Sequence, residues 1–330
     1  MSLRSVNQYH PEHPLLVTLH PELLLLIAEC LQQDQASVSN LAAVCRMTHD
    51  TLLPTLYSNV ALHDATSISL FCRTVASPSI VPYSDLVQKL WIGPTQPAPF
   101  REIALLVDQI RLAFNTLRHL QQLTLTPTTP LLGRLFTGLA CPFQLTQLVC
   151  ASHPDAHFAG FLQRQPSITH LELGDLEMGW SARSIVGLAN HHHNYAISGL
   201  PFLPHLTSLI AEPAIIASLC PGRPINRVGI HGPVGTVGKA LAAAIVQSTA
   251  SVCTIAIETH TEDEWRNMLS HLIDPLKSTP VAATLKTLNI TSQLVGVIVT
   301  SVLHKTLTKI LLYGLRNPEW QSPVLLDPAS

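Results

Sequence analysis

The segment ITHLEL, residues 168 to 173, is the clearest copy of a pattern that organises most of this chain. Its apolar residues stand at the first, fourth and sixth positions, and the alternation at its end is typical of a half-buried strand. Eight further segments repeat this spacing. They begin at Val87, Leu120, Leu145, Leu206, Ile225, Val252, Leu285 and Leu307.

From Val87 to Leu307 the pattern advances by about 27.5 residues per step, within the range of leucine-rich repeats. Helical stretches are expected between the strands. They are 103–112, 239–246, 294–303 and a helix at 265–273 that Thr261 and Glu264 open as a capping box. A strand with its returning helix cannot bury its apolar face alone, so successive units must stack. The sequence therefore predicts an α/β fold in residues 83–330, an irregular leucine-rich-repeat solenoid with a parallel sheet on its concave face.

In such an array, the side chains that flank each inner apolar residue point out of the open face of the sheet. We expect a protein substrate to bind there. The predicted substrate-facing residues are Lys89, Trp91, Gln122, Gln147, His170, Glu172 and Arg227. Their mixed, weakly charged character predicts protein recognition without identifying the target.

The front of the chain has a different pattern. Residues 19–31 read LHPELLLLIAECL, with a proline suited to the first turn of a helix. Leu23, Ile27, Cys30 and Leu31 form one expected buried stripe, while the leucines between them spread apolar surface around the helix. Ser39 is the expected N-cap of a second helix, and a third follows at 52–57. So small a module leaves apolar surface to be covered by the next domain or by a partner helix.

The order of residues across positions 18 to 58 resembles an F-box, and the repeats resemble the degenerate leucine-rich arrays that accompany F-boxes in many fungal proteins. The resemblance rests on LHPELLLLIAECL, on Leu41, Val44, Cys45 and Arg46, and on the LPTLY segment at 53–57. His20 stands where that family usually has proline. The resemblance implies that the first helices bind a Skp-type adaptor, and through it a cullin. The residues it assigns to adaptor binding are Leu19, Pro21, Glu22, Leu23, Leu24, Ile27 and Leu31.

Four regions follow from these patterns. Residues 1–17 are expected to be a flexible N-terminal tail, and 18–58 the F-box-like module of three helices. Asp64 is the expected cap of a helix through Phe71, after which Ser77, Pro78 and Pro82 interrupt the chain. We therefore assign 59–82 to a connecting helix and linker, and 83–330 to the repeats.

Composition limits the possible functions. Of the 330 residues 47% are hydrophobic and 12% are charged, with a formal net charge of −2. We therefore expect no binding to nucleic acid or to an anionic membrane through bulk charge. The seven scattered cysteines lack a C-x-x-C spacing, which favours buried free thiols over disulfides or a zinc site. With no secretion signal recognised, an intracellular protein is expected, cytoplasmic, nuclear or both.

Three segments invite a catalytic or ligand-binding interpretation. Gly232, Gly235 and Gly238 precede Lys239 as in a phosphate loop, but the Walker spacing is absent. The three histidines at 191–193 cannot converge on one ion without further ligands, and the acidic run 262–264 suits the first turn of a helix. No known catalytic motif is present, so we expect neither an enzyme nor a metal or cofactor.

The main hypothesis is the substrate-recognition subunit of a cullin-based (SCF-type) ubiquitin ligase, with the adaptor on the F-box-like module and a protein substrate on the repeats. The alternative is a leucine-rich-repeat binding scaffold that is not coupled to ubiquitination. In that case the three helices only cap the repeats. An enzyme built around the histidine run is a third, weaker hypothesis.

Overall fold

A computed structural model of the chain describes most of the module and the repeats. The described residues are 19–31, 34–77, 83–93, 100–125, 135–150, 156–174, 202–259, 267–292, 297–302, 311–314 and 324–325. The predicted tail at 1–17, the histidine run and the acidic run lie outside them.

Three helices form the N-terminal module: α1 (Pro21–Cys30), α2 (Gln35–Ala42) and α3 (Arg46–Ser58). The proline opens α1, as expected from its missing N–H. The carboxylate of Asp34 caps α2 by accepting a hydrogen bond from the Ser37 N–H, 3.1 Å away. The prediction that Ser39 caps this helix is wrong, because Ser39 lies inside α2.

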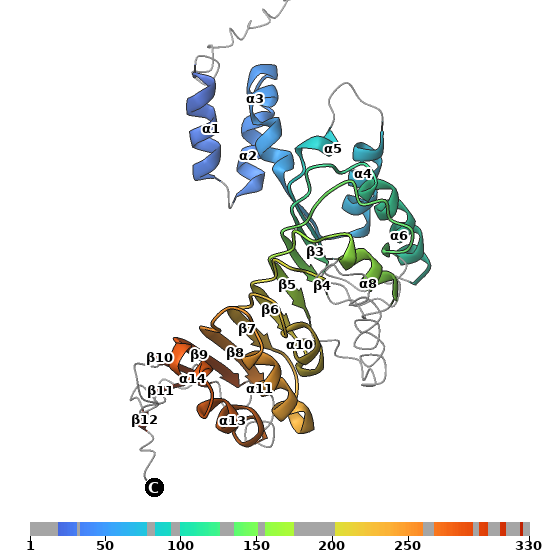
Figure 1. Cartoon of the computed structure of the whole chain (residues 1–330). Coiled ribbons are helices and arrows are strands. Elements are labelled where there is room, and N and C mark those ends of the chain that lie inside the picture. Colours follow the sequence, from blue (N-terminus) through green and yellow to red (C-terminus); the bar gives the residue numbers. More distant parts are fainter. Residues whose placement is uncertain are drawn as a thin grey trace, which may run out of the picture.

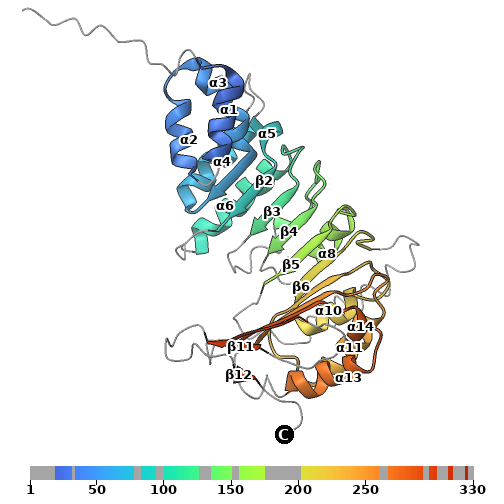
Figure 2. The ribbon, with the colours of Figure 1, turned by 90° about the vertical axis from the view of Figure 1, so that its left-hand side faces the viewer.

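Within the described residues, the repeats form one sheet whose twelve strands follow each other in chain order. Neighbouring strands from β1 to β9 are all parallel, so the sheet grows by one strand for each unit (Figures 1 and 2). These strands are β1 (Asn59–Leu62), β2 (Lys89–Ile92), β3 (Gln122–Leu125), β4 (Gln147–Cys150), β5 (His170–Leu173), β6 (Ser208–Ala211), β7 (Arg227–Ile230), β8 (Thr254–Thr259) and β9 (Thr287–Ser292).

The first eight predicted repeats each place their last two apolar residues on a strand, from β2 to β9, with these residues buried. The expected parallel sheet is thus confirmed. Strand β1 was not predicted, although Tyr57, Val60 and Leu62 have the same spacing. It pairs with β2 in register, and Val60 and Leu62 belong to the core of the repeats. Residues expected to connect two domains therefore contribute to the sheet, while the domain division itself stays a prediction.

Among the described residues, helices cover one face of the sheet and leave the other open (Figure 1). Asp64 caps α4 (Ala65–Ala76), as predicted, by accepting from the Ser67 N–H at 2.8 Å. The expected helices at 103–112 and 239–246 are confirmed, because they lie within α6 (Phe100–Phe114) and α11 (Gly238–Val246). The covering helices are α4, α5 (Tyr83–Leu86), α6, α8 (Ala156–Gln163), α10 (Pro213–Leu219), the 3-10 turn η3 (Gly235–Val237) and α11.

A ladder of threonine hydroxyls links the strands just before they begin. The Thr146 hydroxyl donates to the Gln121 carbonyl at 3.1 Å, Thr169 to Thr146 at 3.1 Å, and Thr207 to Thr169 at 3.0 Å. The N–H of each threonine donates to the same carbonyl. The ladder therefore extends the pairing of β3 to β6 by one residue, although the repeats differ in length.

One buried polar side chain joins two consecutive units on the helical side. The Gln165 amide oxygen accepts from the Leu145 N–H at 2.7 Å, and its nitrogen donates to the Phe143 carbonyl at 3.2 Å. Gln165 is fully buried among apolar residues. Because both ends of its amide are paired, the two hydrogen bonds offset the cost of burying this polar group, and they link the two units.

The C-terminal end departs from the prediction. Residues 294–303 were expected to be helical, but β10 (Val297–Val302) is a strand antiparallel to β9. β11 (Leu311–Gly314) is antiparallel to β10, and β12 (Val324–Leu325) to β11. The ninth predicted repeat therefore does not add a parallel strand.

Part of the helix expected at 265–273 is described. It includes the π-helical turn η4 (Leu269–Ile273), followed by α13 (Asp274–Lys277) and α14 (Val281–Thr284). The proposed capping box at Thr261 and Glu264 lies outside the described residues.

Candidate functional site

Helix α1 carries an apolar surface that the described parts of the chain leave open. Leu23 is 48% exposed, Leu26 55% and Ile27 37%, and Cys30 is exposed as well. These four residues, at positions i, i+3, i+4 and i+7, lie on one side of the helix. We call them the α1 stripe. The spacing is the one by which an amphipathic helix presents itself to a partner.

A different side of α1 is buried inside the module, while Leu25, which lies outside the stripe, is also 38% exposed. Leu24 and Ala28 have no exposed surface and contact a small core with Val38, Ala42 and Leu52. The expected buried stripe through Leu23 and Ile27 is therefore wrong. The helix is rotated so that Leu24 and Ala28 face inward. Leu24 belongs to the predicted adaptor-facing set, and its burial gives it a role within the module.

The remaining members of that set lie at the two ends of α1. Leu19 and Leu31 are half-buried, and Pro21 and Glu22 are exposed. The His20 ring pairs with the Glu22 carboxylate at the surface instead of capping the helix. Sequence reasoning left Leu26, Val44 and Met47 out of the set, although the last two are 42% and 36% exposed. The i, i+3 spacing from Leu23 was the signal for Leu26.

The face of the sheet opposite the helices, here called the open face, presents two rows of side chains. Strand register places these residues opposite one another from β1 to β9. The first row is Asn59, Lys89, Gln122, Gln147, His170, Ser208, Arg227, Thr254 and Thr287. The second is Ala61, Trp91, Thr124, Val149, Glu172, Ile210, Gly229, Ala256 and Asn289. All seven predicted substrate-facing residues are in these rows, and their part in binding stays a prediction.

The strongest electrostatic feature of the open face is at β5 to β7. The His170 Nε2 and Glu172 Oε2 atoms are 3.8 Å apart, close enough for an ion pair when the ring is protonated. The pKa of Glu172 is lowered, first by its interaction with His170 and then by the positive charges of His170, His231 and Arg227, while partial burial opposes the shift. His231, which follows β7, was not among the predicted residues.

The glycines that resembled a phosphate loop have structural roles. Gly232 and Gly235 have positive φ angles of 81° and 43°, so they form the turn into α11. A Cβ at Gly238 would lie 2.7 Å from His271 Cβ, so this glycine allows α11 to approach η4. These contacts explain the glycines by packing.

Side chains suited to metal or redox chemistry do not gather in the described part of the chain. It contains no group of three His, Cys, Asp or Glu residues that could hold an ion. All seven cysteines are free, as predicted, and four are buried. Burial raises the pKa of Cys72 and of Cys220 to about 12, which keeps both thiols protonated.

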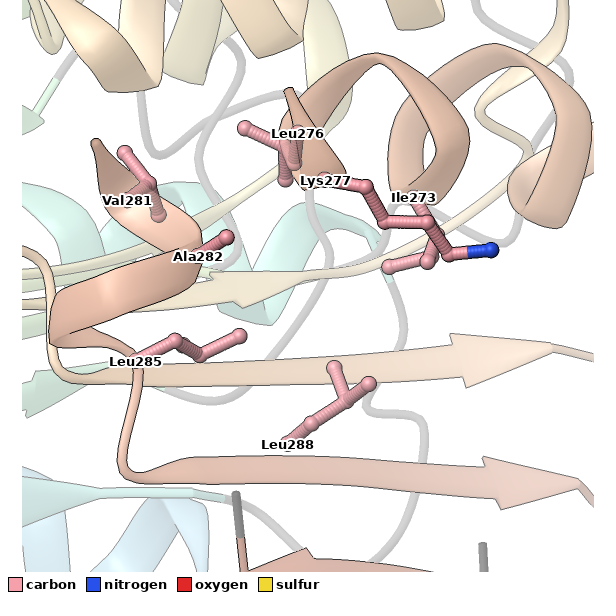
Figure 3. Close-up of a pocket in the computed structure, with 7 residues that line it drawn as sticks. All are labelled: Ile273, Leu276, Lys277, Val281, Ala282, Leu285 and Leu288. Carbon is pink, nitrogen blue, oxygen red and sulfur yellow. The ribbon is translucent and has the colours of Figure 1, made fainter. Parts of the chain in front are cut away.

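A small gap under the last helices is lined almost entirely by aliphatic side chains (Figure 3). Leu288 points from β9 toward α13 and α14, and the Lys277 amine extends away from the other lining residues. A ligand would find no hydrogen-bonding group among the aliphatic side chains. We interpret the gap as imperfect packing in the core of this unit.

Comparisons with known proteins do not suggest a function, so a functional assignment depends on the residues and geometry of this chain. No protein-family model matches the chain, and a search of curated proteins finds no similar sequence. Among the helices of the described residues, none has the length and apolarity needed to cross a membrane.

Proposed function

We propose that this protein is the substrate-recognition subunit of a cullin-based ubiquitin ligase. The N-terminal module would bind a Skp-type adaptor, and the open face of the repeats would bind the protein to be ubiquitinated. The single observation that carries the proposal is the α1 stripe, which exposes two leucines and an isoleucine on a helix whose Leu24 and Ala28 are already buried in the module.

Energetics favour a partner for this surface. Fully burying a leucine or isoleucine side chain contributes about 1.5–3 kcal/mol, and the three residues of the stripe are between about one third and one half exposed. The small core of the module does not include the stripe residues, so it does not cover their exposed surface. A partner helix or groove laid along α1 would therefore gain binding energy without disturbing Leu24 or Ala28.

The arrangement of the two regions also suits a receptor. The module lies at the N-terminal end of the sheet, and the open face extends away from it strand by strand (Figure 2). An adaptor on α1 would leave most of the open face accessible. One protein could therefore hold the adaptor and a substrate simultaneously.

Capture by a recombinant Skp-type adaptor tests the proposal. The unaltered chain should be retained on immobilised adaptor, and the double variant Leu23→Asp with Ile27→Asp should be lost. Because neither residue belongs to the core of the module, the variant should stay folded, with a cooperative melting transition close to that of the unaltered chain. Leu112→Asp is a matched control, since Leu112 is 63% exposed on α6 in the repeats.

The same experiment separates the ligase receptor from the scaffold alternative. Failure of the unaltered chain to bind the adaptor would contradict the proposal and favour a scaffold. Equal capture of the unaltered chain and the double variant would show that the α1 stripe is not the contact.

A further inference from the structure

A second surface feature lies on the open face, where β5, β6 and β7 place His170, Ser208 and Arg227 side by side in the first row. Ser208 is only 8% exposed, and its hydroxyl has no hydrogen-bond partner among the described residues. Buried hydroxyls are normally paired, because an unpaired one loses its bonds to water. This serine is therefore a buried hydrogen-bond donor without a partner among the described residues.

Arg227 provides a second donor in the next position of the row. It is exposed, and its guanidinium makes no ion pair or side-chain hydrogen bond with the described residues. Neighbouring strands lie about 4.8 Å apart, so the two side chains start within reach of one small group. The planar fork of an arginine matches the two oxygens of a carboxylate.

We infer that Ser208 and Arg227, with His170 beside them, bind a side-chain carboxylate in an acidic segment of the protein carried by the repeats. One carboxylate oxygen would accept from the guanidinium and the other from the Ser208 hydroxyl, once the neighbouring side chains that bury this hydroxyl have moved aside. The inference rests on the proposed function, because it assumes that the open face receives a protein, and it adds the chemical class of the recognised segment.

Local charge favours a carboxylate over other groups. Glu172 lies in the second row on the same strand as His170 and already pairs with that ring. With neutral histidines, Glu172 and Arg227 cancel each other in charge. Glu172 repels any anion, and it repels a doubly negative phosphate more strongly than a singly negative carboxylate, whereas Arg227 repels a cationic side chain. A single negative charge with two acceptor oxygens fits the remaining donors.

Binding of short labelled peptides to the full chain tests the inference. The probes are the octapeptides acetyl-(Ser-Glu)4-amide, its glutamine counterpart, its lysine counterpart and one with phosphoserine in place of glutamate, followed by fluorescence anisotropy. We expect the glutamate peptide to bind about tenfold more tightly than the glutamine peptide, as a charge-assisted contact implies. Arg227→Ala should remove this preference, whereas Lys239→Ala, which removes an exposed charge on α11, should preserve it.

Ser208→Ala provides a readout that a purely structural serine would not give. It should weaken the glutamate peptide severalfold while leaving the melting temperature unchanged or higher, because it removes an unpaired buried hydroxyl. A lower melting temperature with unchanged affinity would overturn the role of this serine.

The remaining outcomes also decide the inference. Equal binding of the glutamate and glutamine peptides, no binding of the glutamate peptide, or tighter binding of the phosphoserine or lysine peptide would each overturn it. Adaptor capture through the α1 stripe is measured separately. Loss of peptide binding with intact adaptor capture would therefore leave the proposed function standing, and loss of capture alone would leave the carboxylate site standing.

Discussion

The N-terminal module and the repeats use similar leucine-rich sequence but bury it to different extents. In the repeats, each strand from β2 to β9 has a neighbouring strand on both sides and helices over one face, so residues such as Leu148 and Leu171 are fully buried. In the module, α1 has the other helices on one side only, and Leu23, Leu26 and Ile27 stay exposed. The comparison teaches that these three residues are exposed because no neighbouring element covers their side of α1, and not because the module is richer in apolar residues.

The largest expected effect comes from removing a core leucine of the repeats. Leu148→Ala should lower the free energy of unfolding by about 2–5 kcal/mol, because it leaves a cavity in a closed core. Leu26→Ala in the α1 stripe should change it by much less, about 0.5 kcal/mol, because more than half of this side chain is exposed and little packing is lost. Urea denaturation of both variants measures the two changes in the free energy of unfolding. Equal destabilisation would mean that the stripe is part of a core.

A smaller effect is expected where helices of the repeats approach most closely. Gly238→Ala would place a Cβ 2.7 Å from His271 Cβ and 2.9 Å from the His271 carbonyl oxygen. Alanine favours the helix by about 1 kcal/mol, but backbone cannot move aside cheaply, so we expect a net loss of about 1–3 kcal/mol. Thermal unfolding of the variant and the unaltered chain measures this loss of stability. Gly160→Ala in α8 is a suitable control, because its added Cβ would meet no atom within 4 Å.

The smallest expected effect depends on pH and belongs to the open face. The pKa of Glu172 is lower in the folded chain than its ordinary value, chiefly through His170. Its ionised form therefore stabilises the fold above the unfolded value of about 4.3, and this contribution is lost as pH falls through the folded value. Glu172→Gln should melt at most about 2 °C lower at pH 6, and this difference should shrink as the pH falls below the ordinary value of a glutamate. A difference that grows in acid would contradict the assigned direction.

The repeats were largely predictable because their pattern is local. Each strand from β2 to β9 carries the same three apolar positions, and the spacing alone placed the two rows of the open face. Strand β1 has the pattern but follows α3 directly, so it was assigned to a connection. The segment 297–302 contains mostly β-branched residues, and that local preference favours strand β10 over the expected helix.

The two candidate surfaces were only partly predictable. Consecutive leucines from 23 to 26 give α1 apolar residues on every side, so periodicity could not decide which side faces the core. Contacts of Leu24 and Ala28 with α2 and α3 decide it. Ser208 is an ordinary serine in the sequence. Only its burial without a hydrogen-bond partner distinguishes it, and that depends on the neighbouring strands.

Labelling of Cys30 by iodoacetamide, read by mass spectrometry, tests the exposed α1 stripe most directly. Cys30 ends the stripe and is the exposed cysteine of the seven, while Cys253 in the repeats is half-buried and serves as internal control. We expect Cys30 to react first in the free chain and to be protected by saturating Skp-type adaptor, with Cys253 unchanged. A Cys30 that is already protected in the free chain, or that reacts equally fast with the adaptor present, would contradict the account.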